Sequence, residues 1–346
     1  MRWRLAAAFV LLSVSTGGML LALVWQLSWW SLLVGVGALL VTAGLFALVL
    51  APRRAKPILL AGAVVLAGPF VLRAVTARGT EGHGLITLPG ARGTRLIDRL
   101  VPERDGVLAA AGMMGWVRGL DDDEIGDLRP ILARAYDRID VPALRLPTPA
   151  IATYLGLESP NAFDVVVISP RAGEGSRAPS GALLFLHGFA GGFYVYCWEL
   201  AQAAREANLL TICPSFDASG AWWTPRGEQT LLETLSYLRA RGMKRIYLAG
   251  LSNGAAAASV FALQHERELK GLILISGTRE QTPPALPTLV IQGARDRMMP
   301  ATLARAYADR SRHVRYHEIP GGHFVLLSKH ELVRPLIAEF LRANEM

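Results

Sequence analysis

The hydrophobic pattern divides the chain into two parts, because the first 78 residues are almost entirely apolar while the rest alternates apolar and polar segments. Two stretches, about 5–24 and 31–50, are each long enough to cross ~30 Å of hydrocarbon as helices. A third, about 58–75, contains Pro69 and spans only if Arg73 extends its side chain toward the bilayer surface. We predict two or three transmembrane helices here, with an interfacial or buried helix as the alternative for the third stretch.

Basic residues flanking the apolar stretches predict their orientation. The N-terminus carries arginines, and the connection between the second and third stretches carries Arg53, Arg54 and Lys56. The positive-inside rule places both on the cytoplasmic side. Three spans would leave everything after residue 78 outside the cell, whereas two would leave it inside. We expect a multi-pass protein of the cell membrane with its C-terminal domain on the extracytoplasmic side.

Residues 79–149 show no repeat and are predicted to be a linker with helices that could cover the following domain. The apolar segment Val107–Leu120 is expected to pack on the core, with a roof over a site or contact with the membrane as alternatives. A second helix is predicted over 122–139, where the acidic run 121–124 would cap its N-terminus rather than bind a metal.

From about residue 150, short apolar runs alternate with helical stretches. This alternation predicts an α/β domain over 150–346, with a mostly parallel sheet and helices on both faces. Its length is sufficient for one substantial hydrophobic core. The predicted strands are Phe163–Ile168, Ala182–Leu186, Leu209–Cys213, Arg245–Ala249, Leu272–Ser276, Thr288–Gln292 and Val314–Ile319.

A sharp strand-to-helix turn with a serine at its apex follows the fourth of these strands. Its sequence is Gly250-Leu251-Ser252-Asn253-Gly254, and a run of alanines follows it. Both glycines are needed because such a turn brings backbone segments so close that side chains would clash. The turn exposes the Ser252 hydroxyl at the carboxyl edge of the sheet, beside the positive end of the next helix.

Three more strand ends carry residues that would complete a site around Ser252. The glycine-rich loop after the second strand could direct the N–H of Phe189 at the serine, and with the N–H of Asn253 it would form an oxyanion hole. Asp296 follows the sixth strand, where an acid can accept the Nδ1–H of a histidine. His323 follows the seventh strand after two glycines, which leave the loop free to bring the imidazole over the sheet edge.

Together these segments resemble the α/β-hydrolase superfamily, whose members have the same order of serine, acid and histidine. The resemblance covers roughly residues 150–346 and implies that Ser252 is a nucleophile, His323 its base and Asp296 the acid. Glu280 is the alternative acid, because some members place it after the preceding strand. Members that open epoxides or remove halides carry an aspartate at the turn, so the serine favours acyl transfer through an acyl-enzyme.

We therefore predict a membrane-anchored serine hydrolase that cleaves carboxylic esters of small molecules or lipids without a cofactor or metal. An acyltransferase or peptidase would use the same triad, and a non-catalytic membrane binding module is the alternative from another class. Trp222, Trp223 and Tyr194 are candidates for the substrate pocket. The connection 277–287 is too short for a lid, so any lid must come from 79–150 or the loop 216–226.

The charge limits the classes of binding partner, and the cysteines bear on whether the domain contains a metal site or a disulfide. The net charge is +8, but the basic residues are scattered and form no nucleic-acid motif, so they suit an anionic membrane surface. The two cysteines, Cys197 and Cys213, belong to no metal-binding pattern. They would lie at the same level of the sheet, which leaves a disulfide open, but two buried free thiols are the expectation.

Overall fold

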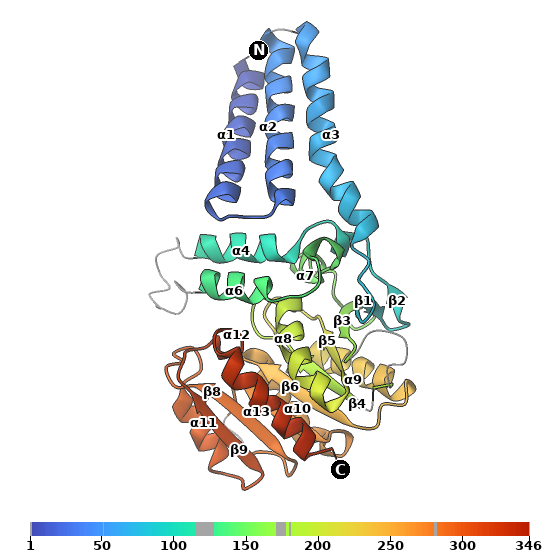
Figure 1. Cartoon of the computed structure of the whole chain (residues 1–346), viewed down its shortest axis with the longest axis vertical. Helices are drawn as coiled ribbons and strands as arrows, with labels where there is room; N and C mark the ends of the chain where they lie inside the picture. Colours follow the sequence, from blue (N-terminus) through green and yellow to red (C-terminus); the bar gives the residue numbers. More distant parts are fainter. Residues whose placement is uncertain are drawn as a thin grey trace.

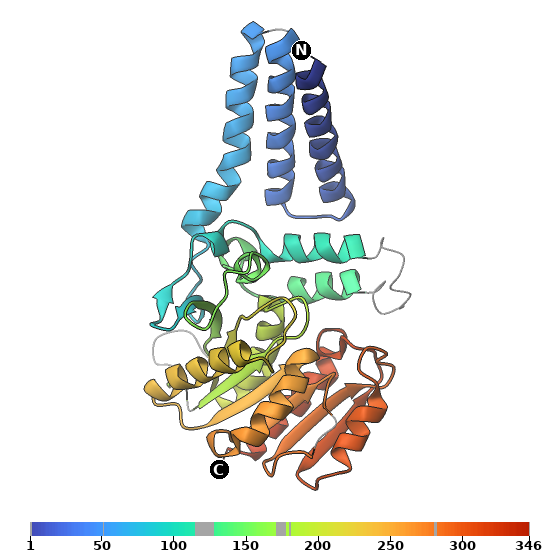
Figure 2. The same cartoon turned by 180° about the vertical axis from the view of Figure 1, so that it is seen from behind.

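The computed structural model describes residues 2–50, 52–114, 128–170, 178–179, 181–279 and 282–345. Three N-terminal helices form a bundle at one end, and a layer of short helices separates this bundle from a nine-stranded sheet (Figure 1). The helices of the bundle are α1 (Arg2–Val24), α2 (Trp29–Leu50) and α3 (Pro52–Thr76). The same three levels are visible from behind (Figure 2).

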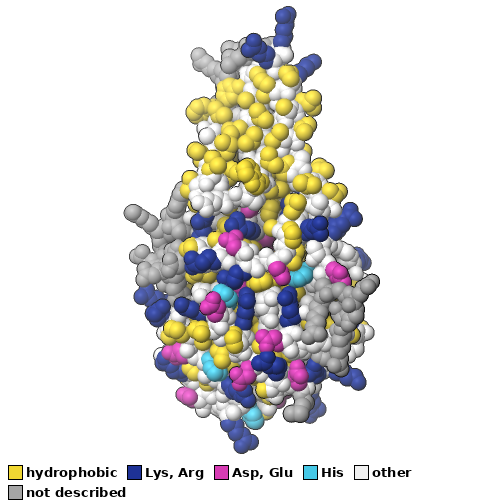
Figure 3. All heavy atoms as spheres, viewed as in Figure 1, with side chains coloured by type: hydrophobic (Ala, Val, Ile, Leu, Met, Phe, Trp, Pro, Cys, Tyr) yellow, Lys and Arg dark blue, Asp and Glu magenta, His cyan; other side chains and the backbone are white. Residues whose placement is uncertain are grey.

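Two helices of the bundle, α2 and α3, are long and apolar enough to cross a membrane. In α1 the apolar segment among the residues with described side chains, Phe9–Val24, is shorter than either of these two helices. The third apolar stretch lies within one continuous helix of 25 residues that includes Pro57 and Pro69. Apolar side chains cover the surface of the bundle, as Figure 3 shows.

Arg73, near the end of α3, does not extend to a bilayer surface as the sequence suggested. Its side chain is fully buried, and it donates hydrogen bonds to four backbone carbonyls in the helical layer. These acceptors belong to Arg99, Val101, Ala143 and Leu146. The guanidinium thus satisfies its donors inside the protein, and α3 ends bound to the layer beneath it.

The sheet has the order β2-β1-β3-β5-β4-β6-β7-β8-β9, and its strands from β5 through β4 to β9 are parallel. All seven predicted strands are present, with ends within two residues of the prediction. They are β3 (Phe163–Ile168), β4 (Gly181–Leu186), β5 (Leu209–Pro214), β6 (Ile246–Leu251), β7 (Gly271–Ile275), β8 (Thr288–Gly293) and β9 (Val314–Ile319).

Two strands lie before residue 150, in the segment that sequence reasoning assigned to a helical linker. They are β1 (His83–Leu88), which pairs antiparallel with β3, and β2 (Arg92–Gly93). The sheet domain therefore begins near residue 83 rather than 150. The sequence did not predict β1 because its apolar run is short, contains Gly84 and is followed directly by Pro89.

Helices cover both faces of the sheet, as predicted. One face packs against α8 (Tyr194–Ala204), α12 (Val325–Ser328) and α13 (His330–Ala343), and the other against α9 (Pro225–Ala240), α10 (Asn253–Gln264) and α11 (Ala301–Ala308). In β6, Tyr247 and Ala249 point to the first core while Ile246 and Leu248 point to the second, because side chains alternate along a strand.

Cys197 in α8 and Cys213 in β5 form a disulfide, with their Cα atoms 6.1 Å apart. The expectation of two free thiols is therefore wrong. The helix lies directly on the sheet at this level, so its separation from β5 falls within the range that a disulfide bridges.

The middle layer contains α4 (Glu103–Met114), α6 (Leu128–Asp137) and α7 (Ala150–Tyr154), with short 3-10 helices η1 (Ile97–Arg99) and η2 (Ala143–Arg145). Two further 3-10 turns, η3 (Arg205–Ala207) and η4 (Glu266–Glu268), lie at the sheet domain. The segment Val107–Leu120 lies in α4 as far as Met114, and the helix predicted over 122–139 is described from Leu128 onward, as α6. The acidic run 121–124 lies outside the described residues.

Candidate active site

The turn between β6 and α10 has the geometry that the sequence predicted. Ser252 has φ +55° and ψ −120°, a conformation that is strained for a residue with a side chain. A Cβ atom on Gly250 would lie 2.4 Å from the carbonyl oxygen of Gly254, and one on Gly254 would lie 2.1 Å from that of Leu186. Both glycines are therefore required by the close approach of α10 to strands β6 and β4.

A histidine and an acid meet at the neighbouring strand ends. The imidazole of His323, which follows β9, donates from Nδ1 to Asp296 Oδ2 at 2.9 Å. Asp296 follows β8 and also accepts the backbone N–H groups of Met298 and Met299 and the side-chain amide of Gln292. Both side chains are buried, so this network holds the carboxylate and orients the imidazole.

The glycine-rich loop after β4 lies directly beside the serine. A Cβ on Gly188 would be 3.0 Å from Ser252 Cβ and 2.9 Å from the Leu251 carbonyl oxygen, so only glycine lets the loop pass this close. Asn253 is the first residue of α10, and the first N–H groups of a helix have no partner within it. Its side chain donates to the Ser219 carbonyl at 2.9 Å, which ties the turn to the loop after β5.

His187, at the start of the glycine-rich loop, has a structural role. Its Nδ1 donates to the Gly188 carbonyl at 2.8 Å, and its Nε2 accepts the backbone N–H of Phe216 at 3.2 Å. Burial lowers the pKa of this imidazole to about 4, so it stays neutral near pH 7. The neutral ring can donate at one nitrogen and accept at the other, which the two bonds require.

Ser252 and His323 line one apolar cavity of about 140 Å³. The glycine-rich loop contributes Phe189, whose side chain is 68% exposed at the cavity's edge. The opposite wall is a roof formed by the helices α4 and α6, which places the cover in the 79–150 segment rather than in the loop 216–226. The roof residues are Val107, Ala110, Ala111, Leu128 and Leu132.

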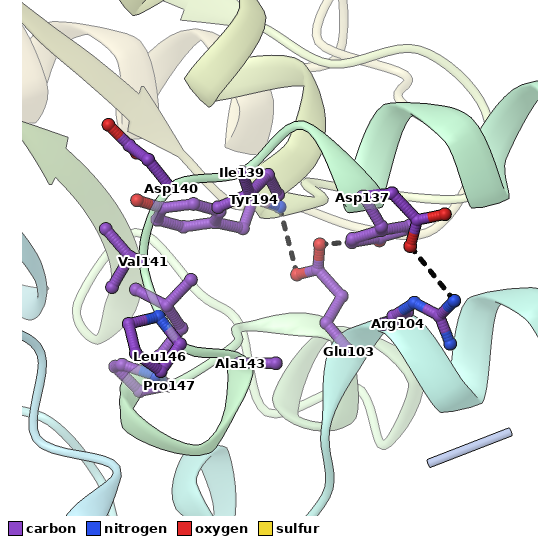
Figure 4. Close-up of a pocket in the computed structure, with 12 residues that line it drawn as sticks. Glu103, Arg104, Asp137, Ile139, Asp140, Val141, Ala143, Leu146, Pro147 and Tyr194 are labelled. Carbon is purple, nitrogen blue, oxygen red and sulfur yellow. Dashed lines mark hydrogen bonds and ion pairs between the residues drawn. The ribbon is translucent and has the colours of Figure 1, made fainter.

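Three residues predicted for the substrate pocket do not line this cavity. Trp222 is 2% exposed and packs against Phe216 in the sheet core, with its indole N–H bonded to the His187 carbonyl. Trp223 is 44% exposed, with the Arg279 guanidinium over its ring. Tyr194 lines a different cavity of about 310 Å³, shown in Figure 4. Glu280, the alternative acid, lies outside the described residues.

The roof residues were not among the predicted site residues, although a roof over a site was one alternative for the segment Val107–Leu120. Val107, Ala110 and Ala111 follow the i, i+3, i+4 spacing of one helix face, on which Val107 and Ala111 are buried and Ala110 is exposed. The spacing marks a helix face but does not show what that face covers. Phe193, which precedes α8, and Tyr196 within it also line the cavity, because Tyr194 and Tyr196 point in different directions from the helix.

No protein-family model matches the chain, and no curated protein matches it significantly. Among solved structures, it is similar to Est1E from Butyrivibrio proteoclasticus, with a TM-score of 0.45 and 16% identity over 53% of this chain and 94% of that one. XC6422 from Xanthomonas campestris, described as an α/β serine hydrolase without lid, has a TM-score of 0.45 and 19% identity over 53% and 89%. A thermophilic esterase from Thermogutta terrifontis has a TM-score of 0.43 and 17% identity over 54% and 96%.

The chain's own geometry identifies its fold. A mostly parallel sheet carries the serine turn, and the serine, the acid and the histidine follow in that order at the ends of β6, β8 and β9. The chain thus has the α/β-hydrolase fold, preceded by two apolar helices that are long enough to span a membrane.

Proposed function

We propose that this protein is a membrane-anchored serine hydrolase that cleaves carboxylic esters through an acyl-enzyme. The observation that carries the proposal is the convergence of Ser252, in its strained turn, and the His323–Asp296 pair on one apolar cavity. Ser252 is 9% exposed and shares the cavity with His323, and a serine that shares a pocket with an oriented base is the arrangement that acyl transfer requires.

In this mechanism His323 takes the proton of the Ser252 hydroxyl as its oxygen attacks the ester carbonyl. The N–H groups of Phe189 and Asn253 stabilise the negative charge that develops on the carbonyl oxygen. Asp296 stabilises the imidazolium, which then protonates the leaving alcohol. His323 next activates a water molecule, whose attack on the acyl-enzyme releases the acid and restores Ser252.

The lining of the cavity supports an acyl group as the part of the substrate that it binds. Most of the lining is aliphatic or aromatic, and the roof contributes only alanine, valine and leucine side chains. Such a surface favours a hydrocarbon chain through burial of apolar area. The substrate is therefore an acyl ester, either of a small molecule or of a lipid.

The placement of the basic residues supports an extracytoplasmic hydrolase. Arg53, Arg54 and Lys56 lie at the start of α3, which is at the end of the bundle that faces away from the sheet (Figure 1). The positive-inside rule puts that end in the cytoplasm, and the sheet domain then lies across the membrane. A disulfide between Cys197 and Cys213 suits the oxidising side.

Two measurements with the full-length protein test the proposal. Ser252→Ala is expected to abolish turnover of short p-nitrophenyl esters, while Ser259→Ala, a buried serine in the same helix α10, is expected to retain it. Both variants should keep the wild-type melting temperature. Turnover that persists in Ser252→Ala would exclude the mechanism.

The second measurement is labelling of intact cells with a membrane-impermeant fluorophosphonate. Labelling that requires Ser252 is the expected result. Labelling only after lysis would support Ser252 as the nucleophile but would place the sheet domain on the cytoplasmic side. No labelling in either case, with folded protein present, would favour the non-catalytic binding module.

A further inference from the structure

Helix α4 presents two opposite faces to two different parts of the molecule. On an ideal helix, Asp105 and Gly112 are seven residues apart and share one face, while Glu103, Val107 and Ala110 lie on the other. The first face meets the α1–α2 connection, and the second meets the sheet domain and the proposed active site. Figure 1 shows α4 between the helical bundle and the sheet domain.

The contact with the bundle centres on Asp105, which is buried. Its carboxylate accepts the backbone N–H of Ser28 at 3.2 Å and the hydroxyls of Ser28 and Ser31. Ser28 immediately precedes the first residue of α2, so the carboxylate sits at the positive end of this helix. An aspartate there both satisfies free donors and interacts favourably with the helix dipole.

Two further contacts hold the α1–α2 connection on the roof. A Cβ on Gly112 would lie 2.6 Å from the indole ring of Trp25, so the ring packs directly on the α4 backbone. From α6, the Arg129 guanidinium donates to the Trp25 carbonyl. Leu27 packs against the same hydrophobic cluster as the roof residues Val107 and Leu132. Both roof helices are thus joined to the connection.

On its other face, α4 is joined to the helix that follows the glycine-rich loop. Glu103 is half-buried, and it accepts the backbone N–H groups of Tyr194 and Val195 at 2.9 and 3.4 Å. These are the first two residues of α8, which begins directly after the loop that carries Phe189. Tyr136 of α6 donates to the same carboxylate at 2.7 Å. Glu103 therefore connects both roof helices to the sheet domain.

We propose that Asp105 and Glu103 are positioning residues through which the bundle holds the roof over the proposed active site. One carboxylate anchors α4 to the start of α2, and the other, two residues earlier, anchors it to the start of α8. The inference rests on the proposed function, because it concerns how that site binds an acyl chain. It makes acyl-chain binding depend on a contact made by a membrane helix.

The test compares Asp105→Asn with Asp137→Asn in the full-length protein in phospholipid nanodiscs. Asp137 lies on the roof helix α6 and pairs with Arg104, but its side chain is exposed and does not contact the bundle. We expect Asp105→Asn to lower kcat/KM for p-nitrophenyl decanoate about tenfold, mainly through KM, because a buried carboxylate with three donors is replaced by an amide. Turnover of the acetate, whose acyl group buries far less apolar surface, should change little, and Asp137→Asn should affect neither ester.

A second variant approaches the contact from the bundle. Replacing Ser28 and Ser31 by alanine removes the two hydroxyl donors and should change the chain-length preference in the same direction. A loss that is equal for both esters and accompanied by a lower melting temperature would show simple destabilisation and overturn the proposal. So would an Asp105→Asn variant with the wild-type chain-length profile.

Hydrogen exchange of the backbone amides distinguishes this inference from the proposed function. If the wild-type protein hydrolyses no ester, the proposed function is wrong. Faster exchange of the α4 amides in Asp105→Asn than in Asp137→Asn would still support the proposal that Asp105 anchors α4. If the wild type is active and the amides of α4 exchange at the same rate in both variants, the anchoring proposal is wrong while the proposed function stands.

Discussion

Replacing Gly254 by alanine tests whether the close packing of the serine turn is required for activity. The new Cβ would lie 2.1 Å from the Leu186 carbonyl oxygen and 2.6 Å from that of His187. Cβ atoms in proteins essentially never approach a heavy atom within 3.0 Å, so α10 must withdraw from β4 by about 1 Å. Both neighbours are backbone atoms at the end of a central strand, which cannot move aside.

The withdrawal should impair catalysis more than stability. Ser252 and Asn253 precede Gly254 directly, so both the proposed nucleophile and one proposed oxyanion donor would move with it. A displacement of about 1 Å can cost on the order of 100-fold in rate, whereas overpacking costs about 1–3 kcal/mol of stability. We expect kcat/KM for a short ester to fall about 100-fold while the protein still folds.

The assay is ester turnover together with thermal denaturation of the same preparation. Gly84→Ala is the matched control, because a Cβ atom on this β1 residue would meet no heavy atom within 4 Å. This variant should retain activity and melting temperature. If Gly254→Ala kept wild-type activity, the packing argument for the turn would be wrong.

Two further predictions concern stability. Burial and the nearby Asp164 raise the pKa of Asp98 from 3.8 to about 8, so the folded state holds a proton that the unfolded state loses near pH 4. The free energy of unfolding should therefore fall as pH rises from about 4 to about 8, by up to ~1.4 kcal/mol per pH unit. Urea titrations at several pH values should show a smaller slope for Asp98→Asn than for the wild type. Equal pH dependence of the two proteins would contradict this prediction. Replacing Cys197 and Cys213 together by alanine should lower the free energy of unfolding by about 3 kcal/mol, because the disulfide closes a loop of 16 residues. If two thiols of the unreduced wild-type protein can be alkylated, the disulfide does not form.

Features that depend on short segments were predictable from the sequence. The seven strands from Phe163 to Ile319 and the serine turn each follow from a local pattern, because a buried strand needs a continuous apolar run and a sharp turn needs glycines. Parallel strands end at the same edge of a sheet, so the meeting of His323 and Asp296 also followed from their positions after β9 and β8. The apolar helices were evident from composition alone.

Only the tertiary structure decided which segments lie against each other. Glu103 and Asp105 are unremarkable as local sequence, yet their partners are 91 and 77 residues away along the chain. The pairing of β1, the contacts of buried Arg73 and the roof over the cavity are equally long-range. Local periodicity shows that a face is buried, but the surface that covers it is selected by packing among distant elements, and packing also placed Trp222 in the core rather than in the cavity.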